Sequence, residues 1–481
     1  MSSLLRTPLL ALMLLAAAPV AAQPATAAAP ATATVPAKAM FDKLLADHWQ
    51  WWLSQNPVTA TTLGVRRYDD QLEDLSVAAF DRRAATATGF RDRLKAIDTA
   101  ALSPADRVSA EVLDRTLAAE IEWNRHDGRL RLFTNREGFH TGFANLPEQV
   151  PLFTLADYQS YVARLEAFPV QADQAIATTR LAARQGWALP CVVLDNFANG
   201  VRAVAEPLDK SRFLKPFATR PQTISPAQWT ALEARARKAV STGVNPAFLR
   251  FADAFEADYL PRCNKAVGIS AVPGGADFYA WRAREETTTS LTPEEIHALG
   301  LSEVARIRAE MDAVAKRAGF SSREAYIRHL RTDPRYYAKS PQELMAAASY
   351  WAKVADGWMP KLFGTLPRLP YGLQEIPAEI APYTTTAFYR PGAALAGRAG
   401  TYFVNTSKLN ERPLFELPAL TIHEAVPGHH HQIALQQELD LPEFRRHAAF
   451  FTAFVEGWGL YSERLGIEMG VYAAPENDMG R

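Results

Sequence analysis

The sequence predicts a mainly helical protein with one small β-hairpin or sheet placed directly before a histidine-rich helix. Apolar residues recur at three- and four-residue intervals through most of the chain beyond residue 39, which is the pattern of amphipathic helices. Residues 360–413 break this pattern with Pro, Gly, Thr and aromatic residues, which favour strands and turns. With 481 residues, 48% of them hydrophobic, the chain can bury a large core.

The N-terminus has the features of a secretory signal peptide at residues 1–22. Arg6 supplies the positive charge, residues 8–18 form a short apolar run, and small residues precede Gln23. No cysteine stands at the cleavage point, so we expect no stable membrane anchor. Residues 23–38, rich in Ala, Pro and Thr, are predicted to be a disordered linker before one domain at 39–481. The mature protein is therefore expected in the periplasm or outside the cell.

The helices of the first half are predicted from periodicity and from their start signals. The first helix ends before Pro57, and two long helices follow at about 77–97 and 104–124. Ser103 and Pro104 are typical of the first positions of a helix. Residues 129–152 are predicted to form a loop that can line a cleft, and another long helix is expected at 156–185.

The second half repeats these signals. Ser225-Pro226 opens a further helix, and Thr292 with Glu295 forms a capping box ahead of an apolar stripe. Ser340-Pro341 opens a helix predicted to reach about Asp356. The stripe consists of Ile296, Leu299, Val304, Ile307, Met311 and Val314.

Two stretches, 384–389 and 400–405, have the composition of strands. The exposed edge of such a sheet can bind an extended peptide by backbone hydrogen bonds; the alternative is a hairpin that only covers the core. Polar side chains in or near these stretches, and one farther along the chain, are candidates for contacting a substrate or a developing oxyanion. They are Tyr383, Tyr402, Asn405 and Tyr461.

Lys+Arg and Asp+Glu both number 52, so the charge balance gives no reason to expect nucleic acid or an anionic membrane as a partner. The two cysteines, Cys191 and Cys263, leave two possibilities open. In an exported protein they can form one disulfide, or both can be free buried thiols.

The chemistry-bearing stretch is 421–432, which holds His423, Glu424 and three more histidines. In the common His-Glu-x-x-His zinc motif the second imidazole lies four residues after the first. Here that position is Pro427, and His430 is about 10 Å along a regular helix, too far to share an ion with His423. Pro427 and Gly428 favour a broken turn that would bring His429 back towards His423. A solvent-exposed histidine-rich helix end is the alternative.

A second carboxylate follows in an apolar, aromatic run. Glu456 is the only charged residue between Ala448 and Leu460, and burying it would be costly unless it were paired or bound to a metal. A glutamate on a second helix is the third ligand in thermolysin-type zinc sites; a local cap or salt bridge is the alternative. Glu463 can hydrogen-bond a ligand histidine, or it can be an ordinary surface residue.

The run from His423 to Gln432, followed by Glu456-Gly-Trp-Gly-Leu-Tyr461, resembles the signature of the bacterial DUF885 family. Similar stretches at 49–57, 62–64, 272–279, 287–311 and 400–405 extend the resemblance over nearly the whole mature chain. Members of that family resemble zinc metallopeptidases of the angiotensin-converting-enzyme and thimet-oligopeptidase type.

The resemblance implies a helical zincin-like fold with a substrate cleft, Zn²⁺ held by His423, His429 and Glu456, and Glu424 as general base. The family pattern continues for roughly another hundred residues beyond Arg481, so we expect the C-terminal helices of the family to be missing. The expected function is zinc-dependent hydrolysis of peptides. The alternative is a truncated, non-catalytic exported protein that binds a metal or a peptide.

Overall fold

The computed structural model describes residues 36–378, 380–394 and 397–481, and the chain is mainly helical. The predicted signal peptide and most of the predicted linker lie outside these residues. Among the described residues, no helix combines the length and apolar character that a membrane crossing needs. The helices are α1 (Ala37–Gln55), α2 (Pro57–Thr62), α3 (Val77–Lys95), α4 (Pro104–Arg125), α5 (Phe139–Ala144), α6 (Leu146–Gln149), α7 (Leu155–Arg184), α8 (Phe197–Ala203), α9 (Pro226–Ala239), α10 (Asn245–Ala254), α11 (Gly275–Thr287), α12 (Pro293–Arg317), α13 (Arg323–Thr332), α14 (Pro341–Leu362), α15 (Leu417–Glu424), α16 (His429–Glu438), α17 (Glu443–His447), α18 (Thr452–Leu465) and α19 (Pro475–Gly480).

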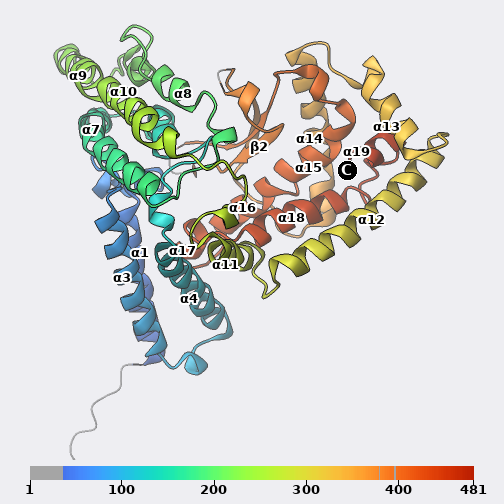
Figure 1. The fold of residues 1–481 in the computed structure, drawn as a ribbon, viewed down its shortest axis with the longest axis horizontal. Helices are drawn as coiled ribbons and strands as arrows, with labels where there is room; N and C mark the ends of the chain where they lie inside the picture. The colour runs from blue at the N-terminus through green and yellow to red at the C-terminus, as the bar shows by residue number, and fades with distance from the viewer. Residues whose placement is uncertain (1–35, 379, 395–396) are drawn as a thin grey trace, which may run out of the picture.

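The helices form an N-terminal group, α1–α10, and a C-terminal group, α12–α19 (Figure 1). Helix α11 lies between them, because its Phe278 and Trp281 belong to the core of the first group while it also packs against α18. In the first group, α3 packs between α1 and α4, and α7 packs against α9 and α10 around a large aromatic core. In the second group, α14 and α18 both pack against α15. Phe444 of α17 belongs to the same core as Phe41 of α1 and Leu113 of α4, so apolar packing joins the two groups.

The predicted helix starts are confirmed. The Ser103 hydroxyl accepts a hydrogen bond from the Asp106 N–H, and Thr292 and Glu295 form the reciprocal capping box. Ser340 caps α14, which ends at Leu362 and so continues past the predicted end at Asp356. An acceptor at the N-cap satisfies one of the first free N–H groups of a helix, which is why these starts can be recognised from sequence.

The apolar stripe of α12 is not buried as an ordinary core-facing stripe would be. Val314 is buried, but Leu299, Val304 and Ile307 are 54%, 44% and 45% exposed. Only the C-terminal turns of α12 reach the core, where Val314 packs with Tyr326 of α13. Periodicity correctly predicts a helix here, whereas the burial of its apolar side depends on which elements lie beside it.

The sheet has three strands in the order β1–β3–β2: β1 (Tyr371–Glu375), β2 (Ala387–Arg390) and β3 (Gly400–Val404). The predicted hairpin pair is present, with β2 antiparallel to β3. β1 was not predicted from the sequence; it pairs parallel to β3, in register Tyr371 with Gly400. The sheet lies beside α14, α15 and α16 (Figure 1), which places it next to the histidine-rich segment.

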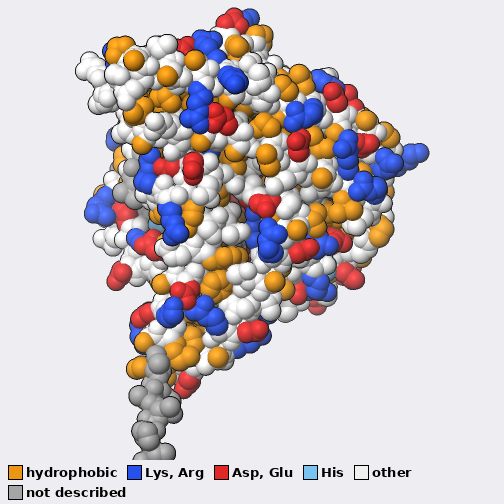
Figure 2. Space-filling model, turned by 90° about the vertical axis from the view of Figure 1, so that its left-hand side faces the viewer, with side chains coloured by type: hydrophobic (Ala, Val, Ile, Leu, Met, Phe, Trp, Pro, Cys, Tyr) orange, Lys and Arg blue, Asp and Glu red, His pale blue; other side chains and the backbone are white. Residues whose placement is uncertain are grey.

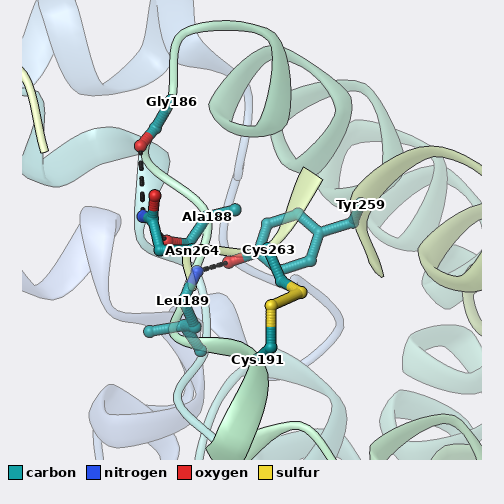
Figure 3. Close-up of a disulfide and its surroundings, with 7 residues drawn as sticks. All are labelled: Gly186, Ala188, Leu189, Cys191, Tyr259, Cys263 and Asn264. Carbon is teal, nitrogen blue, oxygen red and sulfur yellow. Dashed lines mark hydrogen bonds between the residues drawn. A yellow bond between two sulfur atoms is a disulfide. The ribbon is translucent and has the colours of Figure 1, made fainter. Parts of the chain in front are cut away.

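Cys191 and Cys263 form a disulfide, which decides between the two possibilities that the sequence leaves open. Figure 3 shows the bond beside Tyr259, whose hydroxyl accepts a hydrogen bond from the Leu189 N–H at 2.8 Å. The backbone N–H of Cys191 also donates to the carbonyl oxygen of Asn264 at 2.8 Å. The disulfide therefore joins two loops of the N-terminal group that are also connected by hydrogen bonds.

Replacing both cysteines by alanine is expected to lower the free energy of unfolding by up to about 4 kcal/mol. The bond closes a loop with a sequence separation of 72 residues, and removing it restores that conformational entropy to the unfolded chain. Urea unfolding of the oxidised protein and of the Cys191→Ala/Cys263→Ala protein measures the difference. Equal unfolding midpoints with equal slopes would contradict a stabilising role for the bond.

Acidic and basic side chains are interspersed on the face formed by the N-terminal helices, and neither sign gathers into a large region of that face (Figure 2). Many of these charges are paired locally, as Arg91 is with Asp114 at 2.7 Å. Exposed pairs of this kind contribute at most about 1 kcal/mol each. The fold therefore depends mainly on its apolar cores.

Candidate metal centre

The chain between His423 and His429 leaves the helix and returns, as the Pro-Gly pair predicts. Helix α15 ends at Glu424 and α16 begins at His429. Between them the Gly428 N–H bonds the carbonyl oxygen of Ile422 at 2.9 Å. A Cβ atom at residue 428 would lie 1.8 Å from the His423 carbonyl oxygen, so only glycine fits this position.

This turn brings the two imidazoles together. The ring centroids of His423 and His429 are 4.5 Å apart and their planes are nearly perpendicular. The Trp458 indole N–H donates to the Pro427 carbonyl oxygen at 2.7 Å, which ties the turn to α18. A regular helix would have pointed His429 elsewhere, so the broken turn is what makes a shared site for the two rings.

Helix α18 supplies the carboxylate. Glu456 Oε2 lies 3.4 Å from His423 Nε2 and 3.8 Å from His429 Nε2. The three side chains offer ligand atoms that all lie within 4.8 Å of one another. The approach of α18 requires Gly459, because a Cβ atom there would lie 2.6 Å from His423 Cε1; at Gly457 a Cβ atom would meet nothing within 4 Å. Of the two glycines that flank Trp458, only Gly459 is needed for contact.

Glu456 is not buried, contrary to the argument from its apolar neighbours in the sequence. Its side chain is 56% exposed. The neighbouring Phe450, Phe454 and Leu460 are also exposed, at 65%, 58% and 65%. The carboxylate is therefore accessible to solvent while it faces the two imidazoles, and no desolvation cost has to be offset.

Glu463 orients one of the imidazoles. Its Oε1 lies 2.8 Å from His423 Nδ1, a hydrogen bond that leaves His423 Nε2 free to face Glu456 and His429. Glu463 follows Glu456 by two turns of α18, so one side of that helix supplies both carboxylates. A carboxylate behind a histidine is the usual support of a metal-ligating imidazole.

Replacing Glu463 by glutamine is expected to weaken zinc binding by about 10- to 100-fold without removing any proposed ligand. The amide oxygen can still accept the Nδ1–H bond, but it lacks the charge that makes the imidazole a better donor to a metal. Competition with a chromophoric chelator measures the affinity. Glu468→Gln, an exposed change just beyond the same helix, is the matched control; an equal loss in both variants would contradict the role of Glu463.

Burial and neighbouring charges set the protonation of these groups. Burial lowers the pKa of His429 to about 4, and the charge of His423 acts in the same direction. Burial also acts to lower the pKa of His423, but the hydrogen bond to Glu463 and the nearby carboxylates raise it overall. His429 is therefore neutral at neutral pH, the form in which imidazole ligates a metal.

Glu424 lies at the end of α15 with 8% of its surface exposed. Burial raises the pKa of its carboxyl to about 7, although the charge of His423 and a hydrogen bond from the Tyr389 backbone N–H act to lower it. Tyr389 belongs to β2, so the edge strand approaches the carboxylate that follows His423. A carboxyl that titrates near neutrality suits proton transfer.

Two of the candidate polar residues have structural roles. Tyr402 is fully buried in β3 and its hydroxyl lies 3.3 Å from Thr421 Oγ1, beneath α15. Asn405 is also fully buried, and its amide N–H groups donate to the carbonyl oxygens of Ala381 and Thr385. Neither side chain is available to a substrate, because each is enclosed and has partners within the fold.

The structure does not bring Tyr461 to the cluster. Its side chain is 53% exposed and its ring contacts Trp458. Two residues along a helix is a rotation of about 200°, so Tyr461 projects from the side of α18 opposite Gly459. Tyr383 ends a 3₁₀ turn, Ala381–Tyr383, and the placement of its side chain lies outside the described part of the structure.

Comparison with known families gives a match that includes all residues of the candidate site. Residues 57–481 match the model of a family described as "Bacterial protein of unknown function (DUF885)". The chain belongs to the DUF885 family. The crystal structure of the putative lipoprotein from Colwellia psychrerythraea is similar to this DUF885 chain, with a TM-score of 0.83 and 23% identity over 93% of this chain and 81% of that chain.

A second solved structure, a putative lipoprotein of unknown function from Shewanella oneidensis, has a TM-score of 0.57 and 17% identity, over 93% of this chain and 80% of that one. No curated protein matches the chain. At these identities the similarity shows a shared fold, and function has to be argued from the site.

Sequence reasoning missed Tyr389, which borders the site of this DUF885 protein. The Tyr389 backbone N–H acts to lower the pKa of Glu424, and the Tyr389 hydroxyl lies 2.9 Å from His430 Nδ1. His430 is buried against β1 and β2 and is thereby directed away from the cluster of His423, His429 and Glu456. No motif marks Tyr389, because its role depends on the pairing of β2 with β3 and on the packing of α15 against β2.

Proposed function

We propose that this DUF885 protein is an exported zinc-dependent metallopeptidase that hydrolyses peptide bonds. The observation that carries the proposal is the convergence of His423 Nε2, His429 Nε2 and Glu456 Oε2, directly beside the carboxyl of Glu424. The resemblance of these motifs to zinc metallopeptidases of the angiotensin-converting-enzyme and thimet-oligopeptidase type supports the same reading.

The residues present fit a zinc ion. Two imidazole nitrogens and one carboxylate oxygen are a ligand set that catalytic zinc sites use, with a fourth position left for water or substrate. Two atoms that each lie about 2.0–2.2 Å from one ion are at most about 4.4 Å apart, and the contacts of 3.4 Å and 3.8 Å to Glu456 meet that limit. All three ligand atoms lie within 4.8 Å of one another, so a shift of a few tenths of an ångström at most brings the two imidazoles within the limit as well. Because His423 Nδ1 is engaged by the Glu463 carboxylate, His423 Nε2 is free to bind the ion.

The chain's own residues supply the remaining chemistry. A zinc ion, when bound, lowers the pKa of a coordinated water and polarises a carbonyl group. Glu424 accepts the proton of the attacking water at its carboxylate and passes it to the nitrogen of the leaving amine. The partial enclosure of Glu424 keeps its carboxylate close to the reacting atoms and limits competing bulk water.

The edge of β2 can hold the substrate in an extended form. Asn405 donates its backbone N–H to the carbonyl oxygen of Thr386 at 3.0 Å, so these two residues form a hydrogen-bonded pair of the antiparallel ladder. Because such pairs alternate, the backbone groups of Ala387 and Tyr389 point away from β3, to the free edge. The Tyr389 N–H is already engaged by Glu424, so a peptide bound along this edge would pair with the backbone groups of Ala387 and the Tyr389 carbonyl oxygen and would lie next to Glu424.

Export is supported by the secretory features of residues 1–22 and by the description of both structural neighbours as putative lipoproteins. The disulfide between Cys191 and Cys263 agrees with an oxidising compartment, since such bonds are rare in the cytosol. We therefore place the proposed peptidase in the periplasm or outside the cell.

A peptide-library digestion tests the proposal. The purified protein is incubated with a mixture of defined peptides, with zinc, with a chelator, and with zinc restored after chelation, and products are read by mass spectrometry. We expect cleavage that the chelator abolishes and zinc restores. A folded, zinc-loaded protein that cleaves no peptide would contradict the proposal and favour a non-catalytic protein that binds a metal or a peptide.

A further inference from the structure

Two arginines, Arg390 and Arg398, lie at the end of the edge strand. In the described part of the chain, neither guanidinium lies within hydrogen-bond distance of a carboxylate. Arg390 ends β2, and Arg398 follows in the connection to β3, bridged to Ala393 by backbone hydrogen bonds. Both side chains are partly enclosed, and burial lowers the pKa of each; the charge of Arg390 lowers that of Arg398 further. Two positive charges are thus held close together at the end of β2.

The hydrogen-bonding capacity of this arginine pair is largely unused within the described part of the chain. Each guanidinium carries five N–H donors. The Nε atoms of both arginines are buried without a partner among the described residues. Arg398 donates one long bond, 3.4 Å, to the carbonyl oxygen of Pro391, and Arg390 makes only a 3.9 Å contact with Glu148. Unpaired donors on a partly buried charge are costly, which points to a ligand that completes them.

An unpaired buried Nε is not confined to this pair, because Arg115, Arg129, Arg212, Arg412 and Arg446 also have one among the described residues. Most of these use their other nitrogens for closer contacts, as Arg129 does with Asp81 and Asp127. Arg164 is 1% exposed, and it donates to three backbone carbonyl oxygens and to the hydroxyl of Thr61. Arg91, which is more exposed, binds both oxygens of Asp114. The arginine pair at the end of β2 differs from most of the other arginines in that its closest contacts to an oxygen atom among the described residues are 3.4 Å and 3.9 Å.

The position of Arg390 suits contact with a bound peptide. It follows Tyr389, whose backbone N–H meets Glu424, so Arg390 lies one residue along the strand from the proposed base. Its guanidinium lies 4.8 Å over the Phe403 ring, on the face of the sheet opposite the Tyr389 hydroxyl. The Glu148 carboxylate that approaches it comes from α6 of the N-terminal helices and is 70% exposed, so it is free to move aside.

We propose that Arg390 and Arg398 form a subsite that binds a carboxylate of the peptide substrate. The proposal rests on the proposed peptidase function and names a substrate class for it: peptides that carry an acidic side chain or a free C-terminal carboxylate within a few residues of the scissile bond. A guanidinium offers paired N–H groups that match the two oxygens of a carboxylate. The substrate carboxylate would replace the Glu148 carboxylate, which now lies 3.9 Å from Arg390.

Binding measurements with matched peptides test this subsite. Short alanine-based peptides with one Glu or one Gln, each with a free or an amidated C-terminus, are titrated calorimetrically into zinc-loaded Glu424→Gln protein, which cannot turn them over. We expect at least one carboxylate form to bind about 10- to 100-fold more tightly than its amide counterpart. The Glu/Gln pair and the acid/amide pair identify which carboxylate is recognised.

Adding Arg390→Met should remove the difference between acid and amide while leaving the affinity for the amide form unchanged. Arg335→Met is the matched control, because Arg335 is exposed and pairs only with its neighbour Asp333; it should keep the difference. Equal binding of acid and amide forms by the Glu424→Gln protein, no binding of either, or a preference that survives Arg390→Met would overturn the proposal.

The two proposals fail separately. If the wild-type protein cleaves acid and amide peptides equally well, the peptidase function stands and the carboxylate subsite falls. If the arginine-dependent preference is measured but the wild-type protein cleaves nothing, the subsite stands and the peptidase function falls.

Discussion

Replacing Gly459 by alanine is expected to weaken zinc binding strongly while leaving the helices intact. The new Cβ atom would lie 2.6 Å from His423 Cε1 and 2.9 Å from both ring nitrogens, distances that real methyl groups do not adopt. Either the imidazole rotates away from Glu463 or α18 withdraws together with Glu456. Both responses separate the three ligand atoms, so we expect the zinc affinity to fall by about 100-fold or more, beyond the usual effect of losing an outer hydrogen bond.

Gly457→Ala is the matched control for this change. It introduces the same methyl group two residues earlier on α18, where nothing lies within 4 Å. Alanine is favoured over glycine inside a helix by about 1 kcal/mol, so this variant should be as stable as the wild type or slightly more stable. Chelator competition measures the zinc affinity, and circular dichroism measures the helicity. Together they distinguish a loss of zinc binding from a loss of folding. Normal zinc binding by a folded Gly459→Ala protein would contradict the contact between α18 and His423.

Glu424→Gln is expected to keep the zinc and to lose turnover by at least about 100-fold. The amide has the shape of the carboxylate and leaves His423, His429 and Glu456 untouched, but it cannot accept the proton of the attacking water. Initial rates on a peptide that the wild-type protein cleaves, measured with zinc content on the same samples, test the prediction. Glu411→Gln removes the same charge at an exposed position, and it controls for differences in purification and sample handling. Cleavage at the wild-type rate would remove Glu424 from the mechanism.

Local chemistry explains why most helices and the approach of the two histidines could be predicted. The helix starts at Ser103, Thr292 and Ser340 could be predicted because the N-cap interaction involves residues only three positions apart. The Pro427-Gly428 break also acts within one turn of chain, so the approach of His429 to His423 could be expected from residue types and spacing alone.

Features that depend on distant partners could not be predicted in the same way. Strand β1 pairs with a segment about thirty residues later in a parallel arrangement, which no local pattern specifies. The exposure of Leu299 and of Glu456 depends on which helices lie beside them, and the Cys191–Cys263 bond depends on two loops that meet in space. Tyr402 and Asn405 were candidates by residue type, and only their packing shows that they are structural.

The most direct test of the three-ligand zinc site is the zinc content per purified chain, measured by inductively coupled plasma mass spectrometry for the wild-type protein and for His429→Ala and Glu456→Ala. We expect about one zinc per wild-type chain and a sharp fall in both variants, because a tetrahedral site with one open position cannot spare a protein ligand. A folded wild-type protein that binds no zinc after loading, or variants that retain the full amount, would contradict the site.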